Sequence, residues 1–332
     1  MEQIKQLLSK NSIWLVFILL SIAMTFLSPT FLTVTNITNL FVTNSIVGIM
    51  AVGVSFTILS KGIDLSTAGV MALSSVVSAS VVQEIGATNK IFEGMYPWPA
   101  GAALLLGLAV GVIFGLINGL LIAYTKIPPF IATLGSMLVT RAVALLYTTA
   151  FPVPNLSEGF RTLGRDAWVL GIPNIVLVFF VILAIGGFLL SQTRFGKNVY
   201  AIGGNNVAAR VAGINVEKNI IFIYMFSSIC AALAGALFAS RVGSGNANFG
   251  LGFELNAIAA ATIGGVSHSG GIGRISGVLA GILVLGVVNN GMLLLGISPY
   301  IQDIVLGTII VGAVIFDMRR HAKKKLKQIL II

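Results

Sequence analysis

The sequence contains few charged residues: Asp, Glu, Lys and Arg together make up 9% of its 332 positions. A soluble globular domain carries about 25% charged residues, so this chain lacks the charge that a water-exposed surface requires. A disordered chain is also excluded, because such chains are poor in apolar residues and 57% of this one is hydrophobic. The composition therefore indicates a protein that crosses the membrane several times.

Residues that bind metals or take part in catalysis are scarce as well. The single cysteine, Cys230, lies in an apolar run and excludes a disulfide framework. The two histidines, His268 and His321, are too far apart to form a metal-binding pair. Gly196-Lys197 lacks the upstream glycine of a phosphate-binding loop, because Ser191 occupies that position. We expect no cofactor, no metal and no ATPase site in this chain.

Acidic residues in the middle of apolar segments are missing too. Proton- and sodium-coupled carriers place carboxylates at membrane depth, whereas most of the ten acids here lie in loops or at the ends of apolar segments. Asp303, near one end of the last segment, is the nearest exception. Ion-coupled secondary transport of a small polar solute is therefore kept only as the alternative function.

The sequence does contain ten apolar segments, each of which is predicted to be a transmembrane span. The third begins in the polar stretch Lys61–Ser66 and the eighth is short, which suggests half-helices or re-entrant turns. The fourth has glycines at every fourth position from Gly107 to Gly119. This spacing lets two helix backbones approach closely, within one subunit or between two. The predicted spans are 12–28, 44–60, 65–83, 98–124, 130–149, 173–191, 219–240, 254–267, 274–294 and 299–317.

The positive charges predict the orientation in the membrane. Ten crossings place both termini on one side, and with that side in the cytoplasm the inner segments hold fifteen Lys and Arg residues against four outside. This asymmetry predicts cytoplasmic termini. The basic residues lie between apolar segments rather than on one soluble face, so the net charge of +10 does not indicate nucleic-acid binding. The basic tail, 318–332, is predicted to lie against anionic membrane lipid.

The fourth and ninth predicted spans end alike. Asn118-Gly119 precedes a proline turn, and Asn290-Gly291 precedes another five crossings later. Two copies that face opposite ways form the inverted repeat found in many transporters. Amides at membrane depth need hydrogen-bond partners, so they either link helices or line a polar pathway. The pathway hypothesis names Asn118, Asn289 and Asn290.

The longest inner connection, about 192–218, is predicted to contain a short helix on the cytoplasmic face. Asn205 or Asn206 can cap its start, and Gly213 can end it in a left-handed turn. Its small, alanine-rich interior suits the docking of a soluble partner, and a simple connector is the other possibility. The residues assigned to docking are Asn205, Val207, Ala208, Ala209, Arg210 and Gly213.

Several stretches resemble the permease subunits of bacterial ABC sugar importers, the family of the ribose and galactose/methyl-galactoside permeases. The resemblance covers nearly the whole chain and leans toward the galactose-type branch through Gln83, 89–92 and 241–244. Asn256 stands where the family usually has Asp. The matching stretches are Gly62–Ser66, Asn118–Gly119, Pro129–Gly135, Thr193–Lys197, Ala201–Asn205, Ala212–Val216, Glu254–Ala260 and Gly264–Gly273.

The resemblance implies an all-α, type II importer permease of ten helices, with 1–332 as a single domain that works as a homodimer in the bacterial inner membrane. A tandem-domain ABC ATPase would receive the helix at 205–213 as a coupling helix. A periplasmic or lipid-anchored sugar-binding protein would deliver the monosaccharide. We name Arg165 and Arg241 in the outer segments as its docking points, because arginine is well suited to contacts with carboxylates.

Overall fold

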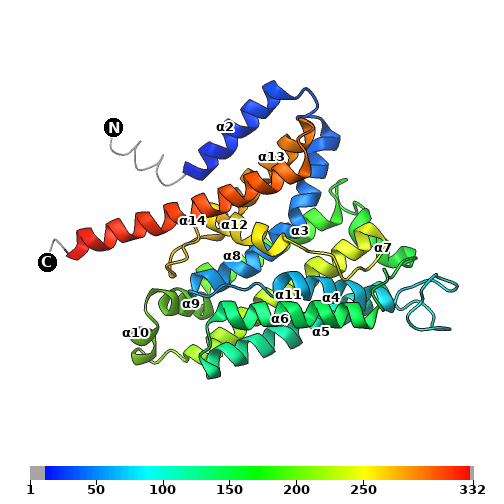
Figure 1. Ribbon diagram of the computed structural model, residues 1–332, viewed down its shortest axis with the longest axis horizontal. Helices are drawn as coiled ribbons and strands as arrows, with labels where there is room; N and C mark the ends of the chain where they lie inside the picture. The colour runs from blue at the N-terminus through cyan, green and yellow to red at the C-terminus, as the bar shows by residue number, and fades with distance from the viewer. Residues whose placement is uncertain (1–11, 330–332) are drawn as a thin grey trace.

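The computed structural model describes residues 12–329, and in this range its regular elements are all helices, with isolated β-bridges but no strand. The helices are joined mostly by short connections (Figure 1). They are α2 (Ser12–Leu27), α3 (Val34–Leu59), α4 (Thr67–Ser80), α5 (Ala100–Leu120), the π-helical turn η1 (Leu121–Thr125), α6 (Pro129–Tyr147), α7 (Glu158–Arg165), α8 (Asn174–Gln192), α9 (Arg194–Gly204), α10 (Asn206–Val211), α11 (Val216–Val242), α12 (Phe253–Ile263), α13 (Ile275–Leu294) and α14 (Pro299–Ile329).

The interior of the bundle is built on α3 and α11. Helix α11 packs against α3, α4 and α5, and α3 also contacts α8, α12 and α13. In their most apolar stretches α3 is 83% buried and α11 is 67% buried, whereas α5, α6 and α8 are 28%, 22% and 33% buried. Helices that are apolar all round but poorly covered by protein are stable only in an apolar surrounding, so the outer helices present their surface to lipid or to another chain.

Among the described residues, six helices are long and apolar enough to cross a membrane: α3, α5 with η1, α6, α8, α11 and α13. The four remaining predicted spans coincide with shorter apolar helices, Ile13–Leu27, Thr67–Ser80, Phe253–Ile263 and Pro299–Ile315. At 1.5 Å per residue, the 11 residues of α12 extend about 16 Å, roughly half of a hydrocarbon core. The third and eighth predicted spans are therefore short elements, as their sequences suggested.

The glycines of α5 make its contact with α11. A Cβ atom on Gly111 would lie 2.6 Å from the carbonyl oxygen of Ser228, and one on Gly115 would lie 2.6 Å from Cα of Met225. No side chain fits there, so glycine is required for the two backbones to approach this closely. The small-residue spacing thus forms a contact within one subunit, the first of the two possibilities that the sequence left open.

Two helices were not predicted from the sequence. The connection between α6 and α8 contains α7, and the inner connection contains α9 in addition to α10. Helix α14 continues beyond its predicted span through most of the basic tail to Ile329, while 330–332 and 1–11 lie outside the described residues. Figure 1 places α9, α10, the start of α2 and the end of α14 at one end of the bundle, and α7 at the opposite end.

Candidate functional site

The predicted short helix is α10, and its boundaries follow local rules. The side chain of Asn205 accepts a hydrogen bond from the backbone N–H of Ala208 at 3.0 Å, so Asn205, not Asn206, is the N-cap. At the other end Gly213 has φ +82°, and its N–H donates to the carbonyl of Arg210. A left-handed glycine ends the helix as predicted.

Helix α10 exposes valine and alanine side chains on one face. Val207 is 74% exposed and Val211 is 85% exposed, and Ala208 is also exposed. Ala209 differs: it is 4% exposed and packs in a small core with Ile202 and Val216. Ala209 therefore faces inward and holds α10 against the rest of the connection, and its side chain is not part of the exposed face of α10.

Arg210 also has a role within the chain. Its Nη2 lies 2.6 Å from Oε1 of Glu217, at the start of α11. The hydrogen bond from Arg210 lowers the pKa of the Glu217 carboxyl below its ordinary value. This ion pair joins α10 to α11 and neutralises the charge of Arg210, so the exposed apolar side chains of α10 are those of Val207, Ala208 and Val211.

Helix α9 connects α10 to the membrane helices. Gly203 lies against the carbonyl of Leu59 at the end of α3, where any side chain would collide. The same carbonyl accepts a hydrogen bond from Gly271 N at 2.8 Å, and Lys61 Nζ donates to the carbonyl of Gly204 at 3.2 Å. These contacts join α9 directly to the end of α3.

The segment after α3 turns back into the protein and buries Asp64 completely. Its Oδ1 accepts hydrogen bonds from the backbone and side chain of Ser66 at 3.0 and 2.5 Å, and its Oδ2 accepts one from Ser227 Oγ at 2.7 Å. Asn118 Nδ2 in turn donates to Ser66 Oγ at 2.9 Å. A buried carboxylate requires such donors, and here they join the start of α4 to α5 and α11.

Sequence reasoning missed the role of Asp64, because it counted this acid among those in loops or at the ends of apolar segments. The available clue was the polar stretch Lys61–Ser66, which separates two apolar segments. Asp64, not Asp303, is the acid at the centre of the protein, since Asp303 is exposed on α14.

The three asparagines assigned to the pathway do not lie together. Asn118 is on α5, which packs against α4, α6, α7 and α11, whereas Asn289 and Asn290 are on α13, which packs against α2, α3, α8, α12 and α14. Asn290 and Asn36 exchange two amide hydrogen bonds of 2.8 and 3.0 Å. Asn290 therefore links α13 to α3. Asn118 and Asn289 each retain a buried Oδ1 atom without a partner among the described residues.

Two further charged residues, Arg141 and Glu254, interact electrostatically within the bundle. Arg141 on α6 donates from Nη1 to the carbonyl of Ala247 at 2.9 Å, and its charge interacts with that of Glu254 at the start of α12. Within the described chain, Arg141 Nη2 and Glu254 Oε2 are buried and make no hydrogen bond. Charged groups inside a membrane protein are costly and often mark a substrate route.

The two outer arginines meet where α7 packs against the end of α11. Arg165 donates from Nε to the carbonyl of Arg241 at 2.9 Å and from Nη2 to that of Val242 at 3.1 Å. Arg165 thus satisfies the final carbonyls of α11. Arg241 is half-buried, which lowers its pKa, and its guanidinium has no hydrogen-bond partner in the described part of the chain.

The fold and these sites define a multi-pass helical membrane protein with a short, exposed helix, α10, at one end. A family model described as the permease component of a branched-chain amino acid transport system matches residues 36–314, and the chain belongs to this family. No solved structure matches the chain.

Curated relatives resemble the chain along most of its length. It is 39% identical to the galactose/methyl galactoside import permease of Escherichia coli strain K12 over 324 residues, 96% of each chain. It is 41% identical to the ribose import permease of Bacillus subtilis strain 168 over 277 residues, 83% of this chain and 82% of the relative. The ribose import permease of Escherichia coli strain K12 is 38% identical over 322 residues, 95% of each chain.

Proposed function

We propose that the chain is the transmembrane permease subunit of an ATP-driven importer of monosaccharides, of the galactose/methyl-galactoside or ribose class. The observation that carries this proposal is the similarity to permeases named for these sugars over about the whole chain. The subunit provides the route across the bacterial inner membrane, and a partner subunit hydrolyses the ATP.

The proposed topology has ten crossings, an inverted repeat and both termini in the cytoplasm. Six long apolar helices and four shorter ones coincide with the ten predicted spans. The excess of Lys and Arg in the inner segments supports this orientation. It also agrees with the arrangement in Figure 1, where α9 and α10 lie at the end opposite α7.

Helix α10 is proposed to dock into a tandem-domain ABC ATPase. Val207, Ala208 and Val211 form an exposed apolar face on a helix too polar overall to enter lipid, and such a face is stabilised when a partner covers it. The contacts of α9 with the end of α3 supply the connection from this docking site to the membrane helices.

The opposite end is proposed to receive a periplasmic or lipid-anchored sugar-binding protein. Arg165 and Arg241 lie together there, and arginines at an interface rim increase the association rate with an acidic partner. The poorly covered helices α5, α6 and α8 leave apolar surface for membrane lipid and for a second copy of the chain in a homodimer.

For the pathway, the contacts support Asn289 and Asn118 over Asn290. Each of the first two has a carbonyl oxygen free to accept a hydrogen bond from a sugar hydroxyl once the helices move apart. The amide of Asn290 is already used by Asn36. Weak neutral hydrogen bonds of about 0.5–1.5 kcal/mol each allow a sugar to be released after it enters.

Reconstitution in proteoliposomes tests the function. The permease together with its ATPase and binding protein should take up radiolabelled galactose or ribose only when ATP is supplied, and the permease alone should take up neither. Uptake by the permease alone that collapses with a proton or sodium gradient would instead establish the ion-coupled carrier, in which the buried Asp64 is the candidate coupling group.

A further inference from the structure

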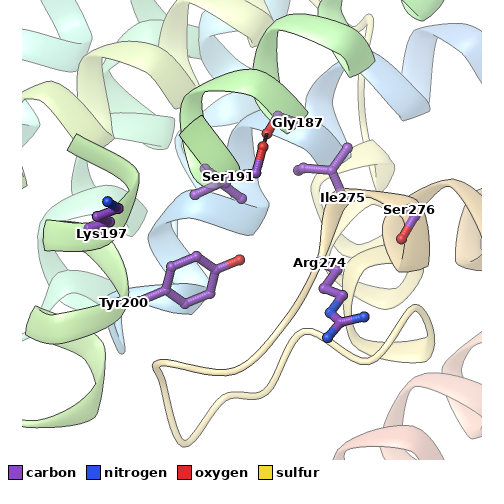
Figure 2. Close-up of a pocket in the computed structure, with 8 residues that line it drawn as sticks. Gly187, Ser191, Lys197, Tyr200, Arg274, Ile275 and Ser276 are labelled. Carbon is purple, nitrogen blue, oxygen red and sulfur yellow. Dashed lines mark hydrogen bonds between the residues drawn. The ribbon is translucent and has the colours of Figure 1, made fainter. Parts of the chain in front are cut away.

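A cavity of about 490 Å³ lies where α8 ends, α9 begins and α13 begins. Figure 2 shows its walls: Lys197 and Tyr200 come from α9 on one side, Arg274 and Ser276 come from the start of α13 on the other, and Gly187 and Ser191 come from α8. None of the residues assigned above to the ATPase, the pathway or the binding protein lines it.

The polar groups of this cavity suit an anion. Lys197 and Arg274 are exposed and have no ion pair or side-chain hydrogen bond among the described residues, and no Asp or Glu of that part of the chain lines the cavity. The backbone N–H groups of Ile275 and Ser276 begin α13 ahead of its first intrahelical hydrogen bond, from Gly277 to Arg274. Free N–H groups at a helix start add to the attraction for negative charge.

Two hydroxyls of the cavity are already committed as donors. Ser191 donates to the carbonyl of Gly187 at 2.7 Å, and Tyr200 donates to the carbonyl of Gly273 at 2.8 Å. They therefore fix the shape of the cavity, and the groups left to bind a ligand are two cations, the hydroxyl of Ser276 and backbone N–H groups. This set recognises a phosphate group.

The remaining wall is apolar, and α8, which forms part of it, is poorly covered by protein. Leu190, Ile275 and Gly187 line the cavity, and α8 also carries the exposed apolar side chains of Ile185 and Phe188, which do not line it. A soluble phosphate has no apolar part that could contact such a wall, whereas the acyl chains of a phospholipid can pack against it. Basic pockets between helices at the cytoplasmic face are typical sites for anionic lipid headgroups.

We propose that this cavity binds the headgroup of an anionic phospholipid from the cytoplasmic leaflet, with Lys197 and Arg274 on the phosphate. The choice of leaflet rests on the proposed orientation. Binding itself requires neither the ATPase nor the sugar-binding protein, so it can be measured on the permease alone. Its failure would leave the proposed transport function intact, and a failure of transport would leave this site intact.

Gly187 offers a substitution that fills the cavity without a clash. A Cβ atom at Gly187 would have no heavy atom within 4 Å, so Gly187→Leu occupies the space of the ligand while leaving the packing of α8 unchanged. Gly101, at the start of α5 and outside the cavity, is equally open, and Gly101→Leu is the matched control. For charge, the double variant K197Q/R274Q is compared with Arg194→Gln, which removes an exposed charge from α9 outside the cavity.

The experiment is native mass spectrometry of the purified full-length permease, titrated with dioleoyl-phosphatidylglycerol or dioleoyl-phosphatidylcholine. We expect one phosphatidylglycerol to bind roughly tenfold or more tightly than phosphatidylcholine. Gly187→Leu and K197Q/R274Q should abolish this preference, and both control variants should keep it.

Three results would overturn the proposal. One is equal binding of the two lipids by the unmodified protein. Another is displacement of phosphatidylglycerol by inorganic phosphate at a similar concentration, which would identify a soluble phosphate as the ligand. The third is unchanged lipid preference in K197Q/R274Q together with loss of ATPase co-purification, which would make the cavity a protein contact.

Discussion

Ser227 donates a hydrogen bond to Asp64 over 2.7 Å, although 163 positions separate the two residues in the sequence. Together with Ser66 and Asn118, this contact joins the break between α3 and α4 to the two helices that pack closest to each other, α5 and α11. The cluster therefore holds the centre of the permease in one arrangement, next to the segment that α9 contacts.

Asp64→Ala should destabilise the protein strongly. The substitution removes the acceptor of three hydrogen bonds and leaves buried hydroxyls unpaired, at a cost of roughly 2–4 kcal/mol. The apparent melting temperature in detergent, read from tryptophan fluorescence, measures the effect. Asp303→Ala removes an exposed acid from α14 and should leave the melting temperature nearly unchanged. Equal melting temperatures for the two variants would contradict a stabilising role for Asp64.

Ala208→Asp and Ala209→Asp should behave differently, although they are neighbours. Ala208 is exposed, so the new charge leaves folding intact but must be desolvated when the ATPase docks. Ala209 is 4% exposed, and a carboxylate there costs several kcal/mol within the permease itself. Melting temperature and ATPase co-purification separate the two cases. We expect Ala208→Asp to lose ATPase binding with an unchanged melting temperature. We expect Ala209→Asp to lose ATPase binding and also to melt at a lower temperature. Full ATPase binding by a folded Ala208→Asp variant would remove α10 from the coupling role.

The Arg210–Glu217 pair predicts how α10 responds to pH. The pKa of Glu217 is lowered from its ordinary value of 4.5, chiefly by the hydrogen bond from Arg210. The pair therefore contributes its stability above about pH 4.5, and this contribution is lost as the pH falls through the lower folded-state pKa. For a partly exposed pair the contribution is about 1 kcal/mol or less.

Amide hydrogen exchange of the segment 205–213 tests this dependence. Exchange should accelerate as Glu217 becomes protonated, and Arg210→Gln should already show the faster exchange at neutral pH. An Arg210→Gln variant with the same protection as the unmodified protein would show that the pair does not hold α10 in place.

The two outer arginines should have separable effects. Arg165 satisfies carbonyls at the end of α11, so Arg165→Gln should lower stability by about 1 kcal/mol and also weaken the association with the binding protein. Arg241→Gln should slow association and reduce its salt dependence without changing stability. Surface plasmon resonance at two ionic strengths measures the association rate and its salt dependence. Arg194→Gln, at the opposite end of the bundle, is the control. Unchanged association in Arg241→Gln would exclude this residue from docking.

Substitution of Asn290 should affect the stability of the protein, whereas substitution of Asn289 should affect sugar uptake. Asn290→Leu leaves the amide of Asn36 without its partner, so it should destabilise the protein, and the double variant N36L/N290L should recover part of that loss. Asn289→Leu should slow sugar uptake while the complex still assembles and hydrolyses ATP. The melting temperatures of the single and double variants test the first expectation, and uptake by proteoliposomes tests the second. Normal uptake by Asn289→Leu would leave this residue without a role in the pathway.

Local features of the sequence were sufficient for several elements. The cap formed by Asn205, the left-handed turn at Gly213 and the glycine spacing of α5 depend on residues within a few positions of each other. The polar stretch before α4 likewise indicated a short element there, and the structure has one. These features were readable because capping and helical periodicity are properties of a single segment.

The composition and the apolar segments by themselves determined that this is a multi-pass helical membrane protein, and the local motifs predicted a short helix in the inner connection, with Asn205 or Asn206 as its cap and Gly213 at its end. Only the tertiary structure decided that Asp64 is buried, that Ala209 faces inward, that Asn118 and Asn290 lie on differently packed helices, and that Lys197 and Arg274 share a cavity. Each of these depends on which helices pack together. Long-range packing joins residues that no periodicity relates, and an apolar helix has no polar face to show which side meets the protein and which meets the lipid.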